Sequence, residues 1–427
     1  MKKSVNVLVI LILILNFNFV YGEDHELLPE DINGEAAILI NGETGEVLFE
    51  KNIHKEMYPA STTKMLTGIL ALEKGDLDKI VTVDDKTPFE ISGTHIALEP
   101  GEELRFKELL NAMLIESAND AAVVIAKDMA GDVESFSKLM NEKAKEIGAI
   151  NSNFVNPNGL PDENHVSTAY DLAMIAKYSM KNKQFKNIVK NYQYSIEPTN
   201  IKDEKRYMQS ANKLLYSNKK INVNGNYVDI KYDGAIGVKT GYTDEAGNCV
   251  VSAAERNGKM VISVVLKSAG NNLWIDTHKL LNYGLNNFDK KMLGFKNEFV
   301  KNIKVDNGNK EFVTGVISEN IETSVKTNME DTISKNIKIN DNIKAPIEKG
   351  QVLGSIEYVL NDKIIQTANI VSAEEISLVA GYNNALSASI FKDISIWWVA
   401  AIIILIFFWR ISMLKRRKKR KRRYRNR

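Results

Sequence analysis

The sequence predicts an α+β fold, in which helices pack on an antiparallel sheet and a small all-β domain and one C-terminal transmembrane helix follow. Three observations support this prediction. Helical and strand-like patterns are mixed up to residue 288, with strands at both ends of a run of helices. Short alternating runs, separated by Asn and Gly, continue to residue 380. An apolar run at 394–414 then precedes a strongly basic end.

The N-terminal end predicts secretion. Lys2 and Lys3 precede an apolar run at 5–20, and small or apolar residues occupy the cleavage positions at 20–22. Residues 1–22 therefore have the features of a signal peptide. An uncleaved anchor is the alternative, and the three asparagines that interrupt the apolar run argue against it.

Charge is unevenly distributed along the 427 residues. When Lys2, Lys3 and the 12 basic residues of 410–427 are set aside, 42 basic and 54 acidic side chains remain, a net charge of −12 for residues 23–409. An acidic body argues against nucleic acid as a partner.

The first candidate motif is Ser61-Thr62-Thr63-Lys64. It follows an alternating hairpin at 36–41 and 47–51, and helical spacing of apolar residues over 61–74 places Ser61 at a helix N-terminus with Lys64 one turn later. A neutral lysine there can take the serine's proton. The spacing alone is weak, because it recurs in this chain at Ser135/Lys138, Ser210/Lys213 and Ser217/Lys220.

Two later motifs strengthen the prediction. Ser117-Ala118-Asn119 opens a predicted helix, and Lys239-Thr240-Gly241, which occurs once, ends an apolar run at 235–238. Ser-x-Asn is itself common, since Ser210-Ala211-Asn212 also matches. The ordered set of three motifs is far more specific than any one member.

The remaining elements define the domains. Further helices are predicted at 106–116, 121–129, 133–147, 168–180 and 272–286. Strands at 250–255 and 259–267 are joined by Asn257-Gly258, a two-residue hairpin signal. Alternating runs are found at 299–305, 311–317, 351–359 and 363–371. We therefore expect a first domain at 23–288, a small β domain at 289–380 and a linker at 381–393.

The C-terminal end predicts a membrane anchor. Residues 394–414 are long and apolar enough to span a bilayer, and Trp397, Trp398 and Trp409 mark its interfaces. The basic residues 415–427 predict a cytoplasmic tail with the body of the protein outside, and they suit contact with anionic lipid head groups.

The three motifs supply the parts of an acyl-transfer site. Ser61 would be the nucleophile, and Lys64 would be its base once burial and the charge of Lys239 lower its pKa below about 10.4. Ser117 would relay a proton to the leaving group. Asn119 would bond a substrate amide or orient Lys64.

The third motif suits binding of a peptide end. Lys239 and Thr240 offer a charge and a hydroxyl to a carboxylate, and Gly241 allows a peptide to approach as an added strand. The backbone N–H groups of Ser61 and Tyr242 would hold the oxyanion. This combination suits a peptide that is cut at its last bond.

These motifs resemble those of a known family. Together with Asn156-Pro157-Asn158-Gly159-Leu160-Pro161-Asp162-Glu163-Asn164-His165 and Ser167-Thr168-Ala169-Tyr170-Asp171, they are similar to the low-molecular-mass penicillin-binding proteins, the serine D-alanyl-D-alanine carboxypeptidases. The similarity covers residues 35–288 and, more loosely, the β domain to residue 380.

The resemblance implies a β-lactamase/transpeptidase-like fold and, as substrate, a peptidoglycan stem peptide ending in D-Ala-D-Ala. It also implies β-lactams as covalent inhibitors, and no cofactor. Carried over by position, Ser61 is the acylated serine and Lys64 its base. Ser117 and Asn119 form the second motif, and residues 239–241 form the third. The chain departs from family members that carry His in place of Asn158, and from those that lie on the membrane through an amphipathic helix.

Two alternatives remain at this point. A β-lactamase usually has Ser-Asp-Asn and a deacylating glutamate, whereas here Ala118 is the middle residue and Glu163 lies in the carboxypeptidase-like loop. A non-catalytic wall-binding protein would not need every catalytic position filled. The histidines lack metal-ligand spacing, so no metal is expected, and Cys249 is expected to be a buried core thiol.

Overall fold

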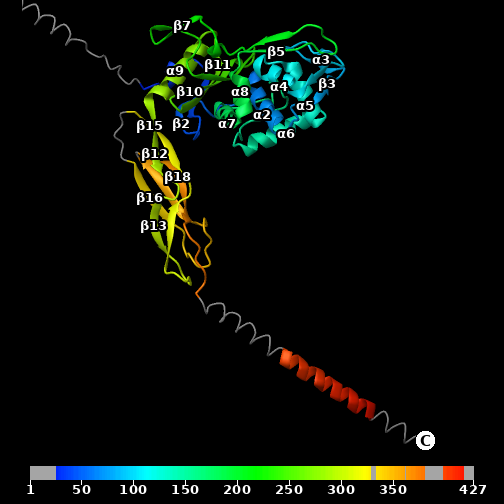
Figure 1. The fold of residues 1–427 in the computed structure, drawn as a ribbon, viewed down its shortest axis with the longest axis vertical. Coiled ribbons are helices and arrows are strands. Elements are labelled where there is room, and N and C mark those ends of the chain that lie inside the picture. The colour runs from blue at the N-terminus through cyan, green and yellow to red at the C-terminus, as the bar shows by residue number, and fades with distance from the viewer. Residues whose placement is uncertain (1–25, 328–332, 361, 380–397, 418–427) are drawn as a thin grey trace, which may run out of the picture. The chain divides into compact units, whose positions relative to one another are not determined.

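The computed structural model describes residues 26–327, 333–360, 362–379 and 398–417. They form two compact units (Figure 1). The first contains the chain up to Lys290 together with Ser324–Met329, and the second contains Lys291–Thr323 and the chain from Glu330 onward. The predicted signal peptide at 1–22, the linker at 381–393 and residues 418–427 of the basic tail lie outside the described residues.

The first unit is built on an antiparallel sheet with the strand order β2-β1-β11-β10-β9. Its strands are β1 Ala36–Asn41, β2 Val47–Lys51, β9 Ala235–Thr243, β10 Gly247–Arg256 and β11 Lys259–Ser268. The predicted β10–β11 turn is confirmed, because Asn257 and Gly258 both have positive φ, 50° and 74°. β9, which carries the third motif, lies at an edge of the sheet.

Helices cover both faces of this sheet. They include α2 Lys64–Lys74, α4 Phe106–Ile115, α5 Asn119–Ala130, α6 Val133–Glu146, α7 Ala169–Met180, α8 Lys183–Lys190 and α9 Asn272–Asn287. Ile38 and Ile40 of β1 join the core that contains α2, α5 and α7, whereas Leu39 packs with Trp274 and Leu281 of α9. Successive side chains of a strand point to opposite faces, so β1 is buried on both.

Several short elements were not predicted, because they contain too few residues to show a period. They are η1 Pro29–Asp31, β3 Ile80–Thr82, α3 Thr87–Glu90, β4 Glu103–Arg105, β5 Gln193–Ile196, β6 Arg206–Gln209, η3 Lys213–Leu215, β7 Lys220–Val223 and β8 Asn226–Asp229. Several predicted boundaries also change, two of them beside the candidate motifs. The strand expected at 235–238 continues to Thr243, and the helix expected from Ser61 begins as the 3-10 turn η2 Ala60–Thr63.

The second unit contains a sheet with the order β13-β14-β18-β17-β16. Its strands are β13 Phe299–Lys304, β14 Phe312–Ile317, β16 Ser334–Ile339, β17 Val352–Leu360 and β18 Lys363–Ser372. Two further strands, β12 Phe288–Gly294 and β15 Ile321–Lys326, pair with each other. β16 was not predicted, because its side chains are almost all exposed and show no alternation.

A final helix, Trp398–Arg417, is long and apolar enough to cross a membrane. It overlaps the predicted span at 394–414, whose residues 394–397 lie outside the described part of the chain. The structure thus has a helix-covered sheet, an all-β unit and an apolar C-terminal helix, as predicted.

Candidate active site

Ser61 lies in η2, directly before α2, and its side chain is partly exposed. The turn is fixed by Thr62, whose N–H and hydroxyl both donate to the Pro59 carbonyl, at 3.2 and 2.6 Å. Strand β9 passes very close to this turn. A Cβ atom at Gly241 would lie 2.8 Å from the backbone nitrogen of Ser61, so only glycine permits this approach.

Lys64 is fully buried one turn after Ser61. Its Nζ lies 3.0 Å from Ser61 Oγ and 2.6 Å from both Asn119 Oδ1 and the Asn158 carbonyl oxygen. The last two atoms only accept hydrogen bonds, whereas the serine hydroxyl can also donate. A neutral lysine has two N–H groups for the two carbonyls and one lone pair for the hydroxyl. The contacts therefore suit an amine poised to take the Ser61 proton.

Electrostatics favours the same protonation state. Burial, and then the charge of nearby Lys239, lower the pKa of Lys64 well below its ordinary value, although Asp120 opposes them. Burial also lowers the pKa of Lys239, to about 7, against the attraction of Glu116. Both lysines thus lie much closer to neutrality than an exposed lysine does.

The second motif lies between α4 and α5. Ser117 is buried and has a φ of 72°, a strained value for a residue other than glycine, and such strain clusters at functional sites. Asn119 begins α5 and receives the hydrogen bond from Lys64, while its Nδ2 donates to the Ser92 carbonyl at 2.7 Å. Of the two roles considered for Asn119, the structure shows the contact that orients Lys64.

Asp120 supports the second motif in a way that the sequence did not suggest. Its buried carboxylate accepts hydrogen bonds from the backbone N–H groups of Ile96 and Leu98, each at 3.1 Å. The Asn119 N–H in turn donates to the Thr94 carbonyl at 2.8 Å. Residues 92–98 are thereby fixed against the start of α5. An aspartate inside a helix N-terminus is common, which is why its role was missed.

The third motif lies inside β9. Lys239 pairs with Val251 and Gly241 with Cys249, and both partners belong to the core on the α2 side of the sheet. Paired residues of antiparallel strands share a face, so Lys239 and Gly241 face Ser61. Lys239 Nζ donates to the Thr240 carbonyl at 3.1 Å. Cys249, directly behind the motif, is buried as predicted.

Tyr242 follows Gly241 with an exposed side chain, whose hydroxyl donates to Asp244 at 2.9 Å. The structure brings Ser61, Lys64, Asn119 and Gly241 into contact and places Lys239 within electrostatic reach of Lys64. The remaining predicted site residues lie within two positions of these in the sequence. They are Ser117, Thr240 and Tyr242.

The loop that contains Asn158 touches the turn that contains Ser61. Gly159 has a φ of 84°, and a Cβ there would lie 1.9 Å from the Ala60 carbonyl oxygen. Asn158 contributes its main-chain oxygen to Lys64, while its side chain accepts from the Leu160 N–H at 3.2 Å. Sequence reasoning left the role of Asn158 open, because a main-chain acceptor has no sequence signature.

His165 supports Thr63, the residue before Lys64. Its Nδ1 accepts from the Val155 N–H at 3.2 Å, so Nε2 carries the proton and donates to Thr63 Oγ1 at 2.8 Å. Burial lowers the pKa of His165 to about 4, and the ring is neutral at physiological pH. The described residues contain no group of side chains that could hold a metal ion.

Comparison with known proteins gives a consistent answer. The chain matches the family model described as D-alanyl-D-alanine carboxypeptidase over residues 23–270, and the one described as penicillin-binding protein 5, C-terminal domain, over residues 288–377. The D-alanyl-D-alanine carboxypeptidase DacF of Bacillus subtilis is 34% identical over 348 residues, which cover 80% of this chain and 85% of that protein.

Solved structures agree. Penicillin-binding protein 5 from Haemophilus influenzae superposes with a TM-score of 0.71 at 25% identity, covering 82% of this chain and all of that one. A peptidoglycan synthesis regulatory factor, PBP3 from Streptococcus pneumoniae, has a TM-score of 0.63 at 26% identity and covers 81% of this chain.

Proposed function

The chain belongs to the D-alanyl-D-alanine carboxypeptidase family, and from that premise we propose that Ser61 is the acylated nucleophile and Lys64 its base. The protein is a serine peptidase that removes the terminal D-alanine of a peptide ending in D-Ala-D-Ala. The observation that carries the assignment of residues is the buried Lys64 Nζ, 3.0 Å from Ser61 Oγ and held by two carbonyl acceptors.

The reaction proceeds through an ester. Neutral Lys64 takes the proton of Ser61 as its Oγ attacks the carbonyl carbon of the penultimate D-alanine. The C–N bond then breaks, and the leaving amine receives a proton relayed through Ser117. Water attacks the ester with Lys64 as base, which releases the shortened peptide and restores Ser61. The N–H groups of Ser61 and Tyr242 hold the negative oxygen in both halves of the reaction.

The edge strand β9 aligns the substrate. A peptide that lies antiparallel along β9 places its terminal carboxylate at Lys239 and Thr240, and Gly241 leaves room for its backbone. Because Lys239 is buried at this position, its charged form favours a peptide with a free carboxylate after the scissile bond. A β-lactam, with an amide carbonyl and a carboxylate, occupies the same place and acylates Ser61.

The domains follow from this assignment. Residues 23–288 carry catalysis on a peptidoglycan stem peptide, residues 289–380 act as a spacer, and residues 394–414 anchor the chain in the membrane. The catalytic domain lies outside the cytoplasm and the basic residues 415–427 lie inside. Protease added to intact cells should degrade the body and spare the tail. A body that resists protease in intact cells, but not in lysed cells, would contradict this topology.

Intact-mass analysis after incubation with penicillin tests the site. We expect one penicillin for each chain, located by peptide mapping on the peptide that contains Ser61. The same preparation should release D-alanine from a pentapeptide ending in D-Ala-D-Ala. An adduct on another residue would contradict the assignment of Ser61.

A further inference from the structure

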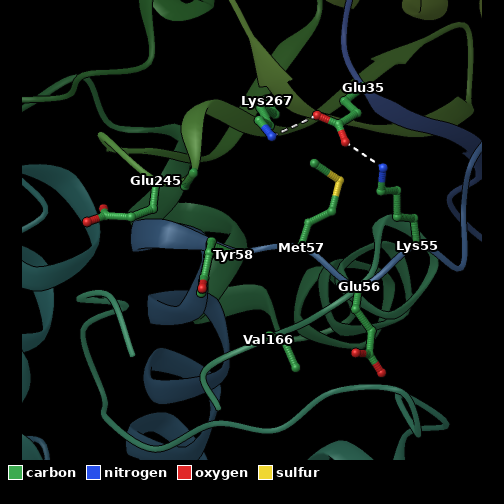
Figure 2. A pocket seen from close by; sticks show the side chains of 9 residues that line it. Glu35, Lys55, Glu56, Met57, Tyr58, Val166, Glu245 and Lys267 are labelled. Atoms are coloured by element: carbon green, nitrogen blue, oxygen red, sulfur yellow. Dashed lines mark hydrogen bonds and ion pairs between the residues drawn. The ribbon is translucent and has the colours of Figure 1, made fainter. Parts of the chain in front are cut away.

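A hollow of about 300 Å³, whose lining residues are drawn in Figure 2, lies next to the candidate active site along the chain. Its wall includes Tyr58, which lies three residues before Ser61, and Glu245 and Ala246, which follow the end of β9. Lys55, Glu35, Glu56 and Lys267 complete the charged part of the wall. The residues assigned to the acyl transfer are not part of this wall, so the hollow is an adjoining space with its own chemistry.

The hollow presents both signs of charge. Lys55 and Lys267 share one carboxylate, that of Glu35, at 2.6 and 3.0 Å, and dashed lines join the three in Figure 2. This group of three has a net positive charge. Glu245 and Glu56 form no ion pair within the described part of the chain, and Figure 2 shows their carboxylates pointing away from this group of three. The lysine side chains are about half exposed, and such pairs exchange partners at little cost.

The backbone is specially shaped at Lys267. Asn248 of β10 pairs with Ser268, but Val250 pairs with Val265, so two residues of β11 oppose Cys249 alone. Lys267 is one of the two and has a φ of 52°. A bulge of this kind redirects a side chain, and a left-handed residue other than glycine is strained. The strain is thus located at the residue that brings a cation to the hollow.

The peptide substrate of the proposed function would run along β9 toward the hollow, and this part of the inference rests on that proposed function. If the terminal carboxylate meets Lys239 and Thr240, an antiparallel peptide runs from there toward Thr243 as it is followed back to its N-terminus. Each residue advances about 3.3 Å. The third residue of a stem pentapeptide, which directly precedes the two D-alanines, then lies beside the turn that contains Glu245 and Ala246.

We propose that this hollow binds the side chain of the third stem residue and selects a diamino acid whose distal end carries both an ammonium and a carboxylate. The carboxylate pairs with Lys267, and the ammonium pairs with the neighbouring Glu35 carboxylate. A side chain that ends in an ammonium alone uses only the acidic part of the hollow and leaves Lys267 without a new partner.

Steady-state kinetics on two pentapeptides tests this proposal with the full chain in detergent micelles. The peptides are identical except at the third residue, which is meso-diaminopimelate in one and L-lysine in the other, so they differ by one distal carboxylate. We expect kcat/KM to be about fivefold higher for the diaminopimelate peptide, the size of one partly exposed charge contact. Lys267→Gln should bring the ratio close to one, and Lys267→Arg should restore it.

A matched control is available on β7. Lys220 is also a half-exposed lysine in an ion pair, with Asp229 at 2.9 Å, but it lies away from the hollow. Lys220→Gln should keep the fivefold ratio. Equal kcat/KM for the two peptides in the unmodified protein, or a preference that survives in Lys267→Gln, would overturn the proposal. Failure of both peptides to release D-alanine, with no penicillin adduct on Ser61, would instead contradict the proposed function.

Discussion

The starts of α2 and α6 contain the same serine–lysine spacing in opposite surroundings. Lys64 is fully buried and its pKa is lowered, mainly by burial. Lys138 has a side chain that is 68% exposed, and its contact with Glu134 at 2.9 Å raises its pKa. The spacing brings two side chains to one helix face, but burial and nearby charge decide whether the lysine can be a base.

The two lysines also differ in where their partners come from. Asn119 and Asn158 lie 55 and 94 residues from Lys64 along the chain. Glu134, the partner of Lys138, lies one turn away on the same helix, and Asp132 caps that helix by accepting a hydrogen bond from the Ser135 N–H. A catalytic environment therefore requires the assembled fold, whereas the surface pair needs only its own helix.

Replacing the two serines gives the largest expected difference. Ser61→Ala should abolish both the penicillin adduct and D-alanine release, because the attacking oxygen is removed. Ser135→Ala should keep both. Intact mass and a D-alanine assay on folded variants provide the measurement. If Ser61→Ala still released D-alanine, Ser61 would not be the nucleophile, and the serine–lysine spacing at α2 would have no more importance than the one at α6.

Replacing the two lysines should give the next largest difference. Lys64→Ala should slow acylation by about 10²–10⁴-fold, the usual contribution of a general base. Lys64→Arg should not rescue it, because guanidinium stays charged and cannot accept the serine's proton. Lys138→Ala should leave the rate unchanged. Rapid-mixing kinetics with a chromogenic penicillin would show this, and a fast Lys64→Arg variant would contradict a neutral base.

The pH dependence of kcat/KM should separate the two buried lysines. As the proposed base, Lys64 works in its neutral form, so the rate should rise as pH increases through its lowered pKa. As the proposed binder of the substrate carboxylate, Lys239 works in its charged form, which is present below its pKa of about 7 and lost above it. We expect a bell-shaped profile with an alkaline limb near pH 7. Lys239→Arg should flatten that limb, and an unchanged limb would remove Lys239 from carboxylate binding.

His165 should give the smallest of these effects, and it concerns stability. Its pKa is about 4 in the folded protein against 6.5 ordinarily, so the folded state holds the ring neutral where the unfolded state would protonate it. The stabilisation of the folded state by neutral His165 is therefore complete above pH 6.5 and is lost as pH falls toward 4. The loss amounts to about 3 kcal/mol of unfolding free energy. Urea unfolding of the full chain at several pH values should show this slope, with His165→Gln reducing it. The matched variant at exposed His54, His54→Gln, should keep it.

Sequence patterns predicted much of this architecture for physical reasons that act locally. Periodicity located the central sheet strands and α2, and Asn257-Gly258 specified the β10–β11 turn through its positive φ values. The ordered motifs correctly grouped Ser61, Lys64 and Asn119, which are in contact.

Other parts of the site could not be predicted from sequence patterns. The Asn158 carbonyl and the backbone contacts of Asp120 involve main-chain atoms, which every residue type carries. The hollow beside the site combines five separate segments, around residues 35, 57, 166, 245 and 267, and no periodicity links them. Sequence patterns therefore predicted the candidate reactive side chains, but they did not predict the main-chain atoms that position those side chains.

The main-chain acceptor for Lys64 has a consequence for how this protein can change over evolutionary time. Any residue at position 158 retains a carbonyl, so substitution there leaves the contact with Lys64 available. Position 159 has no such freedom, because any side chain would begin 1.9 Å from the Ala60 carbonyl oxygen. Over evolutionary time residue 158 can therefore vary, whereas Gly159 must be kept to retain the geometry of the turn that contains Ser61.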